Sequence, residues 1–287
     1  MAGPAIWSHL SELYVEEKRG KIIGIGMAFF SLGQVLGVPL ASLLADFANW
    51  RLVFLIICLG ILICDLSFLV YNHFIKNFAE SMESRKNIFN IKLFKDNKIL
   101  IPLICTFLFQ MASLGTYTYL GEIMHQKFDL GISQLGFLGI MVGAGSIIGS
   151  LISGRLFDLL RMRKRGWEYL LTIFCTILLL ISMLSITIIN SLTISLLFIV
   201  LWFISSGAFT SLQQVLLTLI APKDKGTLIS FNNSVMYLGT AIGVSVMAYA
   251  YANNINIVLI SILVSALSFI ISLQYLIIFR RVKNEQY

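Results

Sequence analysis

The sequence predicts an all-α integral membrane protein with about eight transmembrane helices. Hydrophobic residues make up 58% of its 287 residues and charged residues only 12%, a balance that a water-facing fold does not have. Eight apolar segments are each long enough, at about 20 residues, to cross about 30 Å of hydrocarbon. The predicted spans are 22–45, 52–73, 99–121, 134–157, 168–188, 194–220, 226–251 and 254–279.

The basic residues predict how these spans are oriented. If both termini lie on one side of the membrane, that side carries all of the 21 Lys and Arg residues except Arg51 and Lys127. The positive-inside rule then places both termini and the 74–98 connection in the cytoplasm of a multi-pass protein of the cell (inner) membrane. Because this distribution accounts for the net charge of +7, we expect no nucleic-acid partner.

An internal repeat predicts that the chain contains parts of two homologous half-bundles. A shift of 206 positions places a stretch from the N-terminal end on one near the C-terminal end. The matching dipeptides are Arg19-Gly20 with Lys225-Gly226, Leu32-Gly33 with Leu238-Gly239, and Gly37-Val38 with Gly243-Val244. Fixed repeats in apolar chains are typical of membrane proteins built from two half-domains. Since only 18 residues precede Arg19, we expect the front of the first half to be lacking.

The first span carries small residues and a proline in a recognisable arrangement. Gly33, Gly37 and Ala41 are four residues apart, a spacing that lets a neighbouring helix approach closely. Pro39 lies in the same span and removes one backbone hydrogen bond. With the preceding Arg-Gly hinge and the following Asn49–Phe54, this Gly-x-x-x-Gly-Val-Pro-x-Ala pattern resembles the fifth-helix antiporter motif of the major facilitator superfamily. The resemblance is to its drug:proton antiporter branch, which includes sugar and purine-nucleoside efflux permeases.

The resemblance implies a partial major facilitator fold, from the end of the fourth helix through the twelfth, without the first three to four helices. In that arrangement residues 1–73 are the remnant of an N-terminal half-bundle, residues 74–98 are a cytoplasmic linker, and residues 99–287 are a C-terminal six-helix half-bundle. The polar cleft of such a chain would face lipid or a separately encoded N-terminal half.

One acidic residue, Asp65, lies near the middle of the second span. An ionised acid at the centre of a bilayer costs about 2.5–3.5 kcal/mol on insertion scales. One interpretation is therefore a proton-coupling site. The other is a neutral, hydrogen-bonded Asp that packs against another helix.

Two glutamines inside spans are candidate substrate contacts. Gln110 lies in the third span, which the resemblance implies is the cavity-lining seventh helix, and Gln34 lies in the first span. Polar side chains at membrane depth face protein or water. Gln110 therefore either contacts a solute or joins two helices by a hydrogen bond.

Four further amides lie at one depth on consecutive spans. Gln213 and Gln214 are about seven residues from the cytoplasmic end of the sixth span, and Asn232 and Asn233 are equally far into the seventh. At 1.5 Å per residue both pairs lie about 10 Å deep. They could face one polar chamber and contact a neutral polar or amphipathic solute. Hydrogen bonding between helices is the alternative.

The end of the fourth span is similar to a loop signature of the same superfamily. Gly154 is followed four residues later by Asp158, and Arg161 begins a basic cluster. The resemblance implies a gating loop, in which Asp158 beside a helix N-terminus or an Arg would lock the cytoplasmic face and release it during switching. The alternative is ordinary anchoring of the basic residues at the membrane surface.

These patterns predict transport rather than catalysis. His9, His73 and His125 are scattered, and the four cysteines lie in apolar spans, so we expect no enzyme, no metal and no cofactor. The resemblance implies a secondary active transporter, with proton-coupled efflux of a small polar or amphipathic solute such as a sugar, nucleoside or drug. Its partners would be this solute, protons and the lipid bilayer. The alternative is a truncated, non-transporting fragment or one half of a split transporter.

Overall fold

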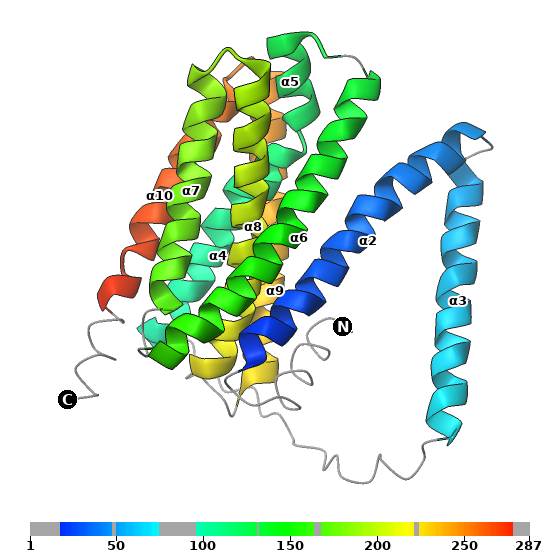
Figure 1. Ribbon diagram of the computed structural model, residues 1–287. Helices are drawn as coiled ribbons and strands as arrows, with labels where there is room; N and C mark the ends of the chain where they lie inside the picture. The colour runs from blue at the N-terminus through cyan, green and yellow to red at the C-terminus, as the bar shows by residue number, and fades with distance from the viewer. Residues whose placement is uncertain are drawn as a thin grey trace. The chain divides into compact units, whose positions relative to one another are not determined.

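The computed structural model describes residues 18–47, 50–74, 96–130, 132–163, 168–220 and 224–277. Within these ranges the regular structure is helical and contains no strand. The helices are α2 (Arg19–Phe47), α3 (Trp50–Phe74), α4 (Asn97–Tyr117), α5 (Leu120–Phe128), α6 (Ile132–Arg163), α7 (Glu168–Ile188), α8 (Leu192–Ile220), α9 (Lys225–Ala252) and α10 (Ile257–Ser272) (Figure 1).

The all-α membrane fold is confirmed. Seven helices in the described residues are long and apolar enough to cross a membrane: α2, α4 and α6 to α10, with the last span running to Ile277. The remaining predicted span, 52–73, falls in α3, where the stretch Phe54–Ser67 is apolar. The predicted span 99–121 ends earlier than expected, because α4 stops at Tyr117 and the short helix α5 follows.

The chain divides into two compact units. The first contains the described residues of 1–35 and 90–287, and the second those of 36–89. The second unit holds the C-terminal part of α2 and the whole of α3, whose side chains Phe54, Ile63 and Leu69 are exposed within that unit. The division into residues 1–73, 74–98 and 99–287 stays a prediction, since 1–17 and 75–95 lie outside the described residues.

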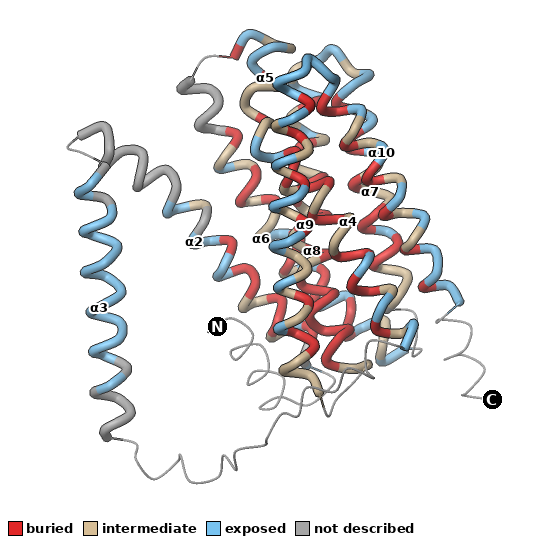
Figure 2. The backbone as a smooth tube through the Cα atoms, turned by 180° about the vertical axis from the view of Figure 1, so that it is seen from behind, coloured by how far each residue is buried: buried red, intermediate tan, exposed pale blue. Residues whose placement is uncertain are grey.

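The first unit is a bundle in which α8 is the central helix. α8 packs against α6, α7, α4 and α9, while α4 also packs on α9 and α10, and α10 on α7. Buried residues concentrate along α8 (Figure 2). Large side chains on outward faces, such as Phe174 and Leu197, are exposed. In a bilayer lipid covers such apolar surface, and helices satisfy their own backbone groups there.

Glycines set how closely the helices of this bundle approach one another. On α6, a Cβ added to Gly149 would collide with the carbonyl oxygen of Ile204 on α8. Between α4 and α9, a Cβ on Gly243 would lie 2.5 Å from the carbonyl oxygen of Met111. Close approach replaces the hydrophobic driving force that helices lack in lipid, because it brings more atoms into van der Waals contact.

The short helix α5 ties two longer helices together at the end of the bundle where α4 stops. The ammonium group of Lys127 donates to the carbonyl oxygen of Ile186, near the C-terminal end of α7, and partial burial lowers the pKa of Lys127. The hydroxyl of Tyr251 on α9 donates to Glu122 at 3.1 Å. A cation suits the C-terminal end of a helix, where carbonyl groups are left without intrahelical partners.

Replacing Gly149 with Ala should lower the stability of the bundle, because the new Cβ would meet a backbone oxygen that cannot turn away. We expect a loss of about 1–3 kcal/mol, the usual cost of overpacking, measured as a lower melting temperature in detergent micelles. Gly139→Ala is the matched control, since no described atom lies within 4 Å of its added Cβ. Equal melting temperatures for the two variants would contradict the close packing of α6 on α8.

Candidate functional site

One face of the central helix α8 carries a row of polar side chains. Trp202, Ser206, Thr210 and Gln214 are spaced four residues apart, and this spacing stacks side chains on one side of an α-helix. Trp202 and Gln214 expose 0% and 1% of their surfaces. A buried polar row in a helix this apolar needs partners on neighbouring helices.

The part of this row from Trp202 to Thr210 forms hydrogen bonds with α4. The indole N–H of Trp202 donates to Ser113 Oγ at 2.8 Å, and Ser113 Oγ lies 3.3 Å from Ser206 Oγ. The amide nitrogen of Gln110 donates to Thr210 Oγ1 at 3.4 Å. Indole is a donor only, so the Ser113 hydroxyl accepts from Trp202 and donates onward to Ser206.

Gln214, at the other end of the row, forms a hydrogen bond with α9. The amide nitrogen of Gln214 donates to Asn233 Oδ1 at 2.7 Å. Beside it, Thr106 Oγ1 of α4 donates to Asn232 Oδ1 at 3.0 Å. Three helices therefore meet through polar groups at one level. We call the set the polar ladder; its members are Thr106, Gln110, Ser113, Trp202, Ser206, Thr210, Gln214, Asn232 and Asn233.

The polar ladder unites four of the five amides predicted on these helices, and Gln213 is the exception. Gln213 donates from Nε2 to the hydroxyl of Tyr275 at 3.0 Å, just beyond the C-terminal end of α10. The reason is helical geometry, because neighbouring residues of an α-helix project about 100° apart. Gln213 and Gln214 therefore bond to different partners, and Gln213 links α8 to the segment just after α10. A chamber that both residues face stays a prediction.

The polar ladder as defined contains none of the predicted site residues of the first two spans. The side chains of Gln34 and Pro39 fall outside the described residues, although both positions are helical in α2. Asp65 lies on α3 in the second unit and is exposed within it. A Cβ at Gly33 would meet no described atom of the first unit, and one at Gly37 none of the second. The close helix approach predicted at these two glycines stays a prediction.

Asp158 of α6 caps the N-terminal end of α2 with both carboxylate oxygens. The backbone N–H of Gly20 donates to Oδ1 at 2.9 Å, and that of Lys21 donates to Oδ2 at 2.8 Å. The first N–H groups of a helix lack intrahelical partners and carry the positive end of its dipole, so a carboxylate stabilises them. We call this contact the Asp158 cap.

Glycines make room for the Asp158 cap. A Cβ on Gly20 would lie 2.5 Å from both Asp158 Oδ1 and the carbonyl oxygen of Gly154, and one on Gly24 would lie 2.6 Å from the carbonyl oxygen of Ser150. Gly154 thus contacts α2 directly, as does Asp158, while the partly buried Arg161 follows on the next turn of α6. The two helices meet backbone to backbone.

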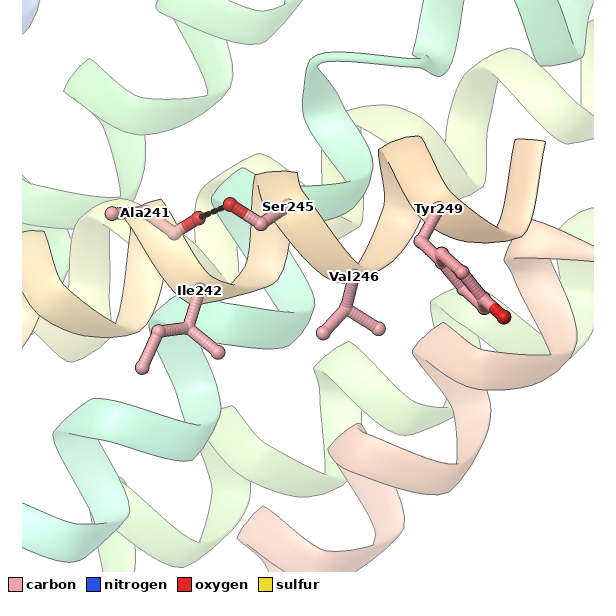
Figure 3. Close-up of a pocket in the computed structure, with 5 residues that line it drawn as sticks. All are labelled: Ala241, Ile242, Ser245, Val246 and Tyr249. Atoms are coloured by element: carbon pink, nitrogen blue, oxygen red, sulfur yellow. Dashed lines mark hydrogen bonds between the residues drawn. The ribbon is translucent and has the colours of Figure 1, made fainter. Parts of the chain in front are cut away.

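An open groove on the outward face of α9 is separate from the polar ladder. It has a volume of about 360 Å³ and is lined by Ala241, Ile242, Ser245, Val246 and Tyr249 (Figure 3). The hydroxyl of Ser245 already donates to the carbonyl oxygen of Ala241 at 2.9 Å. Such a lining lacks the convergent polar groups of a polar-solute site, so we do not assign substrate binding to it.

Comparison with known proteins places the chain in a family. A model of the Major Facilitator Superfamily matches residues 1–244. The chain belongs to this superfamily. It is therefore a multi-pass membrane protein, as the apolar helices require.

Several curated members of the superfamily are similar to this chain. It is 27% identical over 253 residues to the uncharacterised MFS-type transporter YceJ of Bacillus subtilis, a match that covers 86% of this chain and 62% of YceJ. It is 27% identical over 235 residues to YbcL of the same organism, covering 80% of this chain and 57% of YbcL. A probable sugar efflux transporter of Pasteurella multocida is 27% identical over 144 residues, covering 50% and 34%. The chain thus spans about 60% of the length of the first two relatives.

Several residues that form these contacts were not predicted as site residues from the sequence. Ser206 and Thr210 complete the four-residue row that ends at Gln214, and this spacing was a signal that could have revealed them. Gly20 and Gly24 show the same spacing at the start of α2. Tyr275 gave no such signal, because its link to Gln213 depends on how α10 packs. No group of three or more His, Cys, Asp or Glu residues in the described part of the chain is placed to hold a metal ion.

Gln213→Leu should destabilise the bundle, because it leaves the buried hydroxyl of Tyr275 without a partner. A buried unpaired group costs about 1–3 kcal/mol, which thermal unfolding in detergent would detect. The double variant Gln213→Leu with Tyr275→Phe removes both partners and should recover most of the loss. A double variant whose loss equals the sum of the two single losses would contradict the pairing.

Proposed function

We propose that the chain functions in secondary active transport, exporting a small polar or amphipathic solute in exchange for protons. The observation that carries the proposal is the polar ladder, which joins α4, α8 and α9 through amide and hydroxyl groups inside an apolar bundle. Amides and hydroxyls offer donors and acceptors without charge, so they suit an uncharged polar solute. Membership of the superfamily supports transport over catalysis.

The proposed direction and coupling of transport come from the antiporter-like stretch and from an acidic residue in an apolar helix. The stretch from Gly33 to Ala41 resembles an antiporter motif, which favours efflux in exchange for protons. The relative from Pasteurella multocida is named a probable sugar efflux transporter. Asp65 is the proposed proton carrier, because it is an acidic side chain within an apolar helix. Protonation neutralises the carboxylate and so lowers the free-energy cost of keeping this side chain within an apolar helix.

The Asp158 cap is the proposed cytoplasmic latch of the transport cycle. It fastens the N-terminal end of α2 to α6 by two charge-assisted bonds, and such bonds can break and reform when packed helices move against one another. The distribution of Lys and Arg supports placing this end of the bundle, and both termini, in the cytoplasm of a cell (inner) membrane.

Transport can be tested in proteoliposomes that enclose a pH-sensitive dye. Addition of neutral sugars or nucleosides should cause a proton flux that requires the protein, and Asp65→Asn should abolish the dependence on the pH gradient, because an amide cannot carry the proton. Asp129→Asn, a change of the same chemistry at the end of α5, is the control and should leave the flux unchanged. Solute movement that ignores the pH gradient in the wild-type protein would reject proton coupling.

The latch predicts faster amide hydrogen exchange at the start of α2 in Asp158→Asn. Each carboxylate oxygen accepts from a different N–H group, and the substituted amide keeps only one acceptor while it presents a donor to the other N–H. Loss of a helix cap costs about 1 kcal/mol, which corresponds to about fivefold faster exchange for residues 18–24. Unchanged exchange there, with unaltered solute flux, would show that the Asp158 cap is not a latch.

A further inference from the structure

Two buried amide oxygens of the polar ladder have no hydrogen-bond partner within the described structure. They are Gln110 Oε1 and Gln214 Oε1, and their side chains expose only 2% and 1% of their surfaces. Both oxygens are acceptors, on α4 and α8 respectively. An unpaired buried acceptor keeps its full desolvation cost, so two such oxygens in one network of hydrogen bonds require a physical explanation.

The orientation of the Gln110 amide follows from hydrogen-bond chemistry. Thr210 Oγ1 donates its single hydrogen to the carbonyl oxygen of Ser206 at 2.9 Å. Towards Gln110 it can therefore act only as an acceptor. Gln110 must present its Nε2, which lies 3.4 Å from Thr210 Oγ1, and its oxygen is left facing elsewhere.

Gln214 repeats this arrangement one turn along α8. Its Nε2 donates to Asn233 Oδ1 at 2.7 Å, and its oxygen remains unpaired. Because Thr210 and Gln214 are four residues apart on α8, the amide bound to Thr210 and the amide of Gln214 lie about 6 Å apart along the axis. A solute of sugar or nucleoside size is long enough to reach two amides placed one helical turn apart.

The three helices that form the polar ladder carry almost no charge. The helices α4, α8 and α9 contain Lys98 and Lys225 at their first turns and no other charged residue. Near the two oxygens these three helices offer an anion no cationic side chain and a cation no carboxylate. Burying an unpaired charge is far more costly than burying a hydrogen-bonded neutral group.

From these observations we propose that Gln110 Oε1 and Gln214 Oε1 form a two-acceptor subsite that selects uncharged solutes with O–H or N–H donors. This inference rests on the proposed transport function and narrows its substrate class. Gln213 and Asn232 are not part of the subsite, because Tyr275 and Thr106 already pair with them. The remaining unpaired buried atoms are the hydroxyl oxygens of Thr172, Ser211 and Ser268, which carry a hydrogen of their own and are not pure acceptors.

The first experiment needs no solute. Purified full chain carrying Gln110→Leu should melt in detergent at the wild-type temperature or above it, because the substitution removes an unpaired oxygen while Thr210 keeps its bond to Ser206. Gln213→Leu is the matched control and should melt lower, since it breaks a satisfied pair. A fall for Gln110→Leu as large as that for Gln213→Leu would overturn the inference, because the Gln110 oxygen would then be paired in the resting protein.

The second experiment measures binding by thermal shift with defined probes. Methyl glucoside and uridine carry donors without charge; their fully methylated forms lack donors; glucuronate and uridine monophosphate are their anionic counterparts. We expect the wild-type protein to be stabilised by at least one unmodified probe and by none of the methylated or anionic forms. In Gln110→Leu the half-saturating concentration should rise about tenfold, the effect of one lost hydrogen bond, and in Tyr275→Phe it should stay unchanged.

The outcomes separate this inference from the transport proposal. Binding of a methylated or anionic form, binding that is indifferent to Gln110→Leu, or no binding of any probe would each overturn the two-acceptor subsite. Transport of an anionic solute in the proteoliposomes would keep the proposed function and reject the subsite. Donor-dependent binding without any transport would keep the subsite and reject the proposed function.

Discussion

The architecture of the first unit depends on the two glycine-bearing faces of α6. Gly145 and Gly149 let it lie against the backbone of α8, and Ser150 and Gly154 let it lie against the backbone of α2. In lipid a helix gains nothing from hiding apolar side chains, so van der Waals contact between closely spaced backbones holds the pair together. The positions of the Asp158 cap and of the polar row on α8 both follow from where α6 permits its neighbours to sit.

Polar side chains in this bundle form hydrogen bonds of two kinds, within their own helix and between helices. Many Ser and Thr hydroxyls bond to a carbonyl one turn back in their own helix, as Thr116 does to Ala112. Others also cross to a neighbour: Thr116 Oγ1 lies 2.5 Å from Ser261 Oγ on α10, and Thr176 Oγ1 lies 2.8 Å from Ser272 Oγ. Such crossings fix the register of helices at modest energy. The amides of the polar ladder differ, because two of their oxygens remain available.

Composition and periodicity were sufficient to predict the helical membrane fold and the approximate spans, because the thickness of the bilayer imposes a length on each helix. Equal depth on neighbouring helices also located Gln214, Asn232 and Asn233, which meet in the polar ladder. The direction in which Gln213 projects was not predictable, because it depends on rotation of α8 about its axis, and packing against α6 and α7 sets that rotation.

Contacts between distant parts of the chain were the hardest to predict. Gly20 and Gly154 are separated by more than a hundred residues, and no local pattern states that they touch. The spacing of Gly33 and Gly37 also predicts close approach, and at these positions an added Cβ would meet no described atom within the same unit. Small residues at four-residue spacing indicate that a helix can be approached, but the identity of the approaching helix comes from the tertiary fold.

One consequence of the Asp158 cap concerns how the chain tolerates change. The groups that Asp158 grips on α2 belong to the main chain, and every amino acid other than proline supplies the same N–H. Side chains at the start of α2 can therefore change during evolution without weakening these two backbone hydrogen bonds. The features that evolution must retain are a carboxylate at position 158 of α6 and, opposite it on α2, glycine at position 20.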